Sequence, residues 1–342
     1  MSVSGLNRLY IAVIFMTLIT IMSCDDTVQP EPMEPILNVP NGFPEPEFPL
    51  DNQFSVERWQ LGKRLFYDTM LSSNQSISCA SCHKPGLAFS DDKQVSPGVE
   101  ERPGTRNAPT LANVAYHPYY TREGGVPTLE MQILVPIQEH AEFDFNILLI
   151  AERMQSDSTY VLQSKIAYDR TPDPFVITRA IATFERTLLS GDSRYDKFIR
   201  GDHSALSLDE QHGMDLFFSE RLSCSACHSG FNFTNYSFEN NGLYEEYADP
   251  GRFRFTNDEA DRALFKVPTL RNVGVTAPYM HDGSLFSLED VIEHYNQGGA
   301  NHPHKSALVK PLHLSQKEKD DLVAFLQSLT DEHFVNNPKF KN

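Results

Sequence analysis

Cys79-Ala80-Ser81-Cys82-His83 is matched later in the chain by Cys224-Ser225-Ala226-Cys227-His228. The spacing C-x-x-C-H is typical of covalent c-type haem attachment. The two thiols of each motif reach both vinyl groups of one porphyrin, and the adjacent histidine then binds iron as the proximal ligand. A zinc site would use two C-x-x-C pairs as four ligands of one metal and would not require a histidine after each pair. The sequence therefore predicts two c-type haems, with His83 and His228 as proximal ligands.

A longer repeat surrounds the two motifs. The stretch from Gly62 to Tyr67 precedes the first motif as the stretch from Gly213 to Phe218 precedes the second. Downstream, Pro109-Thr110-Leu111 recurs as Pro268-Thr269-Leu270, and the neighbouring matches share this offset of 159 residues. A constant offset over several blocks indicates an internal duplication of a haem domain.

The remaining local signals are mostly helical. Capping boxes at 207–210 and 315–318 stand at the heads of apolar-periodic segments, and 175–189 has the pattern of an amphipathic helix. Gly-, Pro- and Asn-rich stretches at 97–109 and 235–252 predict loops. We therefore expect a mostly α fold of two cytochrome c-like haem domains, at residues 51–205 and 206–342.

The N-terminus has the pattern of an export signal. Arg8 precedes an apolar run from Leu9 to Met22, followed by Ser23 and Cys24 in a context that resembles a bacterial lipobox. We expect a lipoprotein signal peptide at 1–23, a lipid anchor on Cys24 and a Pro-rich tether at 24–50. The alternative is a signal peptide with an incidental cysteine. Either case predicts an exported protein, periplasmic or, with the anchor, attached to the outer membrane.

The charge balance limits the partners. The formal net charge is −17, and no basic stretch stands out that would neutralise phosphates. Nucleic acid is therefore not an expected partner. The acidic surface either serves solubility alone or attracts a basic electron donor.

The repeat also allows the expected surroundings of the two irons to be compared residue by residue. At the offset of 159 residues, Tyr295 corresponds to Pro136, and Val291 corresponds to Gln132. If this helix face lies over the haem, the second iron is offered a tyrosine oxygen and the first is offered a proline, which cannot bind metal. An open first iron with Gln132 and Glu142 nearby suits chemistry, and Glu142 is a candidate proton shuttle. The alternative for Glu142 is a solvated loop position.

The chain resembles the bacterial di-haem cytochrome c peroxidase family, which includes the MauG-type enzymes, over residues 51–330. The motifs that carry the resemblance are Leu61-Gly62-Lys63-Arg64-Leu65-Phe66, Arg106-Asn107-Ala108-Pro109-Thr110-Leu111, Phe184-Glu185-Arg186-Thr187-Leu188, Ala277-Pro278-Tyr279-Met280-His281-Asp282-Gly283 and Leu322-Val323-Ala324-Phe325-Leu326. The resemblance implies that the N-terminal haem is peroxidatic and that the C-terminal haem transfers electrons. It places Gln132, Pro136 and Glu142 in the peroxidatic distal pocket.

The same resemblance implies two further ligand sets. Asn107, Thr276 and Pro278 match a calcium site between the haems. Tyr295 stands where peroxidases of the family have a ligating methionine and where the MauG type has a ligating tyrosine. Met280 remains an alternative sixth ligand of the second haem.

The implied activity is reduction of hydrogen peroxide with electrons from a small redox protein, either a cytochrome c or a cupredoxin. The alternative is a MauG-type oxidase that modifies side chains of a partner protein, and a plain electron carrier is the third class. A homodimer is left open.

Two departures from the family are visible in the sequence. No histidine occurs between His83 and His117, where many members have one that blocks the iron. Arg122 stands where members commonly have a tryptophan between the haems, and the only tryptophan is Trp59.

Overall fold

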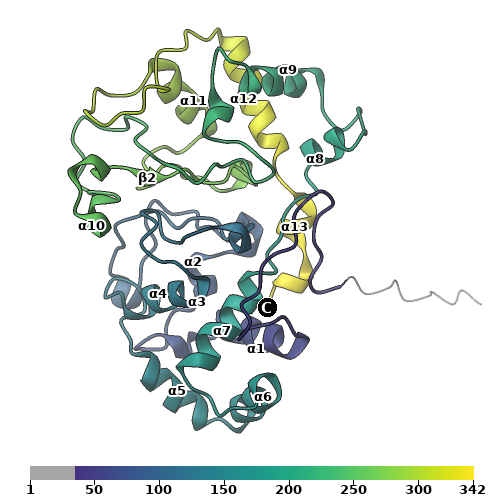
Figure 1. Cartoon of the computed structure of the whole chain (residues 1–342), viewed down its shortest axis with the longest axis vertical. Coiled ribbons are helices and arrows are strands. Elements are labelled where there is room, and N and C mark those ends of the chain that lie inside the picture. The colour runs from purple at the N-terminus through teal and green to yellow at the C-terminus, as the bar shows by residue number, and fades with distance from the viewer. Residues whose placement is uncertain (1–34) are drawn as a thin grey trace, which may run out of the picture. The chain divides into compact units, whose positions relative to one another are not determined.

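Two crossed helix pairs organise the protein, whose computed structural model describes residues 35–342. Helix α1 (Val56–Tyr67) packs on α7 (Pro174–Glu185), and α9 (Leu208–Phe218) packs on α12 (Gln316–Ser328) (Figure 1). Each pair brings together the beginning and the end of one half of the sequence. The expected helices after Ser207 and Ser315 are confirmed, and both begin with a capping box.

One glycine at each crossing allows the helices to approach closely. A Cβ atom on Gly62 would overlap the backbone carbonyl of Ala180, and one on Gly213 would overlap that of Asp321. Because a backbone carbonyl cannot move away as a side chain can, only glycine fits at these positions. The glycines that open the two repeated segments therefore have the same packing role.

Shorter elements complete each half of the chain. The first half has α2 (Cys79–Cys82), α3 (Leu129–Gln132), α4 (Leu134–Gln138), α5 (Ile147–Gln155), α6 (Ser158–Tyr168) and α8 (Arg194–Ile199). The second half has α10 (Phe253–Thr256), α11 (Leu288–Gln297), α13 (Glu332–Asn336) and the strands β1 (Phe238–Glu239) and β2 (Phe265–Lys266), which pair antiparallel. The predicted mostly helical fold is confirmed for the described residues.

Two aromatic-rich cores lie under the helix pairs. In the first, Phe66 and Phe184 have ring centroids 5.0 Å apart, and in the second Phe217 and Phe325 are 5.2 Å apart. The end of the chain returns to the first core, where Phe334 packs against Phe89 with a centroid distance of 5.9 Å. The predicted division at residue 205 therefore does not separate the two cores completely.

Part of the expected tether belongs to the folded body. The Phe43 ring lies 4.7 Å from that of Phe231, and Tyr116 donates a hydrogen bond to the Pro44 carbonyl at 2.8 Å. Residues 36–50 therefore differ from the expectation of a solvated segment, because their aromatic and proline side chains find apolar partners. The signal peptide and Cys24 lie outside the described residues.

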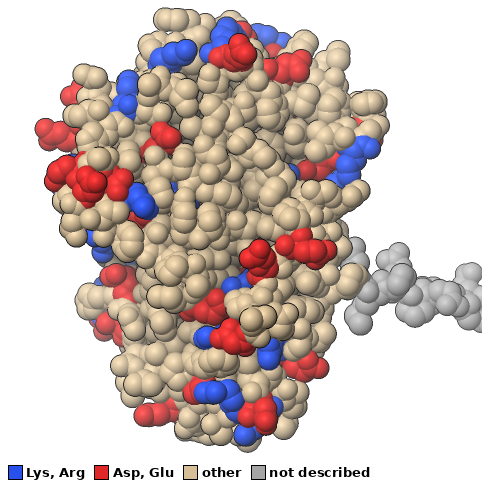
Figure 2. Space-filling model, viewed as in Figure 1, with Lys and Arg blue, Asp and Glu red and all other residues tan. Residues whose placement is uncertain are grey.

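Charged side chains are mixed on the visible face. Figure 2 shows Lys and Arg interspersed with Asp and Glu, without a continuous basic area on this face. Among residues 35–342, no helix has the length and apolar character needed to cross a bilayer.

Candidate haem-binding sites

The first C-x-x-C-H motif presents two free thiols and one oriented imidazole. Helix α2 carries Cys79 and Cys82, and the His83 Nδ1–H donates to the Phe89 carbonyl at 2.8 Å. This bond places the proton on Nδ1 and leaves the Nε2 lone pair available to a metal. Burial lowers the pKa of His83, so the ring is neutral at neutral pH.

The second motif repeats this arrangement. A single 3-10 turn carries Cys224, and the His228 Nδ1–H donates to the Phe233 carbonyl at 3.2 Å. Burial again lowers the pKa of the histidine. Each motif thus offers a thiol pair and a neutral imidazole with a free Nε2, which is the donor set that a c-type haem requires.

Glu142 lies beside the first motif. The loop after α4 holds it in place, since the Phe143 amide donates to the Pro136 carbonyl at 3.1 Å and the Val99 amide donates to the Glu142 carbonyl at 2.9 Å. The Glu142 carboxyl acts electrostatically on both Cys79 and Cys82. Glu142 is an exposed residue, yet desolvation of its carboxyl by neighbouring protein atoms, assisted by the charge of Glu139, raises its pKa to about 7.

Gln132 ends α3, one turn before Pro136 of α4. Its side-chain oxygen Oε1 is buried and has no hydrogen-bond partner among the described residues. Because an unpaired buried acceptor costs free energy, this oxygen is suited to accept a hydrogen bond from a bound molecule. Pro136 has no polar side-chain atom to place there.

Tyr295 lies beside the second motif. It is on α11, where its phenol interacts electrostatically with Cys224 and Cys227, and burial raises the pKa of that phenol to about 12. Asn241 hydrogen-bonds to Tyr295, and its Nδ2 donates to the Met280 sulfur at 3.1 Å. Both candidate sixth ligands therefore neighbour one asparagine, but the interaction with both cysteines distinguishes Tyr295.

The candidate calcium ligand Asn107 is buried, and both its backbone and its side chain are hydrogen-bonded. Its Nδ2 donates to the Lys93 carbonyl at 3.2 Å, and its backbone amide donates to the His281 carbonyl at 2.9 Å. Its Oδ1 accepts from Arg122 Nη2 at 3.2 Å, and its backbone oxygen accepts from the same Nη2 at 2.8 Å. The predicted metal-ligating oxygen therefore already faces a guanidinium.

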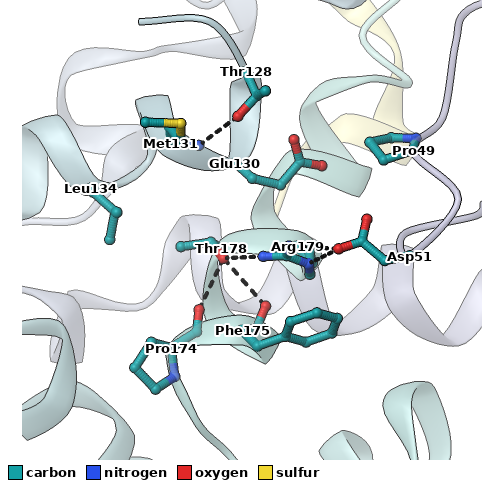
Figure 3. A pocket seen from close by; sticks show the side chains of 10 residues that line it. All are labelled: Pro49, Asp51, Thr128, Glu130, Met131, Leu134, Pro174, Phe175, Thr178 and Arg179. Atoms are coloured by element: carbon teal, nitrogen blue, oxygen red, sulfur yellow. Dashed lines mark hydrogen bonds and ion pairs between the residues drawn. The ribbon is translucent and has the colours of Figure 1, made fainter.

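A separate hollow of about 520 Å³ lies between α3 and α7 (Figure 3). Its charged groups are paired: Glu130 with Arg186 at 2.6 Å, and Asp51 with Arg179 at 2.6 Å. None of the predicted site residues lines this hollow. It therefore does not mark the haem chemistry.

Comparison with known proteins identifies the fold around these sites. Residues 56–204 match the family described as di-haem cytochrome c peroxidase. The methylamine utilization protein MauG of Methylorubrum extorquens is 38% identical over 298 residues, which cover 86% of this chain and 83% of that protein. The chain belongs to the di-haem cytochrome c peroxidase family. Membership in this family implies two c-type haems.

Other members of this family are similarly close. The cytochrome c551 peroxidase of Nitrosomonas europaea is 34% identical over 82% of this chain and 81% of that protein. A solved MauG-like protein associated with microbial copper homeostasis has a TM-score of 0.83 and 36% identity, and covers 89% of this chain and 97% of that one. The di-haem peroxidase BthA of Burkholderia thailandensis, at 22% identity and a TM-score of 0.72, supports the fold alone.

The sequence patterns did not predict that Glu185 is a buried acid near the first motif. Glu185 ends α7 and acts electrostatically on Cys79, and burial raises the pKa of its carboxyl to about 8. The motif Phe184-Glu185-Arg186 contributes to the family resemblance. It does not indicate that Arg186 forms its ion pair with Glu130, at 2.6 Å, and not with the adjacent Glu185. Only the packing of α7 beside the first motif shows this carboxyl near Cys79.

Proposed function

We propose that this chain is an exported di-haem cytochrome c peroxidase that reduces hydrogen peroxide to water with electrons from a small redox protein. Each peroxide molecule takes up two electrons and two protons and yields two water molecules. The electron donor would be either a cytochrome c or a cupredoxin. Relatives that are 32–34% identical and are named cytochrome c peroxidases support this activity.

The two haems supply redox-active iron, and the protein supplies ligands and proton handling. His83 and His228 would bind the two irons through Nε2, with the cysteine pairs as covalent links. Glu142, with a carboxyl pKa near 7, accepts a proton from peroxide and returns it to the leaving oxygen. Gln132 accepts a hydrogen bond through Oε1 and so orients the peroxide.

The observation that carries the proposal is the contrast between the two sites. Glu142, with Glu185 and Asp91, is one of the acids close enough to the first pair of cysteines to raise a thiol pKa, whereas the Tyr295 phenol lies near the second pair. Tyr295 would cap the second iron, while Pro136 leaves the first side free of a ligating atom. An open iron suits peroxide chemistry, and a capped iron suits electron transfer.

A steady-state assay tests this function. The mature di-haem protein should oxidise two equivalents of reduced cytochrome c or cupredoxin per peroxide consumed. The double variant Cys79→Ala, Cys82→Ala should retain the second haem and lose this turnover. If the double variant turns over at the wild-type rate, the first site is not peroxidatic.

The second candidate function is a MauG-type oxidase that modifies side chains of a partner protein. Tyr295 favours it, as do the relatives named MauG at 38% and 34% identity. Peroxide-dependent mass changes in a co-purified partner, without consumption of a reduced donor, would support the oxidase over the peroxidase.

The N-terminal sequence and the internal repeat support an anchored enzyme with two haem modules. Cleavage before Cys24 and lipidation of that residue would tether a periplasmic enzyme to a membrane. The regions 51–205 and 206–342 would be duplicated haem modules, each built on one crossed helix pair. Cys24→Ser should release a membrane-associated protein into the soluble fraction.

A further inference from the structure

Two equivalent hydrogen bonds join the two halves of the chain. The Asn107 amide donates to the His281 carbonyl at 2.9 Å, and the Lys266 amide donates to the Arg122 carbonyl at 2.7 Å. The repeat offset relates Asn107 to Lys266 and Arg122 to His281. The seam therefore has approximate twofold symmetry, and each position has a counterpart in the other half.

In one half of this seam, the chain supplies its own cation. Lys266 Nζ donates to the Tyr119 carbonyl at 2.7 Å and lies 3.4 Å from His117 Nδ1. By the repeat offset, His117 and Tyr119 correspond to Thr276 and Pro278, two of the expected calcium ligands. An ammonium thus occupies the counterpart of the expected metal position.

In the other half, the Arg122 guanidinium contacts one of the expected calcium ligands. It donates to both the backbone oxygen and the Oδ1 of Asn107, the third expected calcium ligand. The guanidinium is partly buried.

The acidic side chains near Arg122 are already paired with other side chains of the protein. Arg106 opposes its charge, while Asp282, Asp249 and Glu123 favour it. Arg106 is itself paired with Glu123 and Asp249, and Asp282 accepts a hydrogen bond from the Tyr244 hydroxyl at 2.6 Å. The acids of this seam are therefore already engaged by side chains of the protein.

We propose that Arg122 replaces calcium between the two haem modules, so that the di-haem enzyme neither binds nor needs this ion there. Calcium requires oxygen ligands at about 2.3–2.6 Å, and Asn107 offers its side-chain Oδ1 as one of them. A guanidinium offers only donors, and its charge beside that oxygen repels a divalent cation. The expected set of Asn107, Thr276 and Pro278 therefore does not suit calcium in this chain.

Metal analysis of the purified di-haem protein tests the proposal. After treatment with EGTA and gel filtration, the wild type should have the same haem absorption spectrum and the same melting temperature with and without about 1 mM calcium chloride. Its calcium content before EGTA should be far below one ion per chain. One bound calcium per chain, removed by EGTA with a change in the haem spectrum, would overturn the proposal.

Variants test whether the guanidinium is the reason. Arg122→Ala and Arg122→Trp should each gain about one calcium per chain, with a melting temperature that rises on calcium addition by mass action. Adding Asn107→Ala should abolish that gain, and the surface variant Arg102→Ala should behave as wild type. If either Arg122 variant retains both haems but gains no calcium, Arg122 is not what excludes the ion. The wild-type measurement decides the first half of the proposal even if both variants fail to fold.

Discussion

Replacing Glu142 by glutamine preserves the size of the side chain and removes the site that exchanges a proton. With a carboxyl pKa of about 7 in place of 4.5, about a tenth of the Glu142 carboxyls are ionised at pH 6 and about nine tenths at pH 8. If the carboxylate takes the proton from peroxide, the rate constant for peroxide cleavage should rise roughly tenfold over this interval. An unperturbed carboxyl would be almost fully ionised throughout and would give a flat profile.

Stopped-flow mixing with peroxide at a series of pH values measures this rate. Glu142→Gln should lower it by roughly 10²–10⁴-fold and abolish the inflection, because no ionisable group remains at that place. Glu139→Gln is the matched control: it removes the neighbouring charge that raises the pKa of Glu142, so the inflection should move to lower pH while the plateau rate is kept. Wild-type kinetics in Glu142→Gln would refute the assignment of this residue as the proton shuttle.

Three further substitutions test the second site, a buried acid and the helix crossing. Tyr295→Met should raise the reduction potential of the second haem by on the order of 0.1 V, since an anionic oxygen ligand favours ferric iron more than a thioether does; an unchanged potential in redox titration would favour another ligand. The raised pKa of Glu185 means that its contribution to stability is fully present below about 4.5 and is lost as the pH rises through about 8. The shift from 4.5 to about 8 corresponds to about 5 kcal/mol, so Glu185→Gln should remove a pH-dependent loss of roughly that size in denaturant titrations, whereas an identical pH dependence would contradict the burial argument. Gly213→Ala should lower the free energy of unfolding by about 3 kcal/mol or more because the new methyl group overlaps the Asp321 carbonyl, whereas Gly86→Ala, with no atom nearby, should change it by less than about 0.5 kcal/mol.

The local features of this protein were predictable because they are encoded in short segments. The spacing of Cys79, Cys82 and His83 predicts a haem attachment site without any tertiary information. The capping boxes that begin at Ser207 and Ser315 predict helices, and the structure has a helix after each of them. The repeat offset also related Tyr295 to Pro136 before either was located in space.

The features that depend on long-range packing were not predictable in this way. Nothing in the order of residues indicated that Phe334 would join the core around Phe89, or that the stretch containing Phe43 would pack on the folded body. The burial that raises the pKa of Glu185 arises from several elements that meet only in the folded chain. Local sequence patterns do not predict such long-range contacts, because each pattern describes only one segment of the chain.

The sequence by itself determined the chemistry of this protein, through two covalent haem motifs, their repeat and two unequal sets of candidate distal residues. Tertiary structure alone decided the neighbours that no local pattern indicated: the Glu185 carboxyl near Cys79 and the Arg122 guanidinium on Asn107. The physical reason lies in the range of the forces involved. Covalent attachment needs only neighbouring residues, whereas desolvation and charge pairing depend on distances that folding sets between residues far apart in the chain.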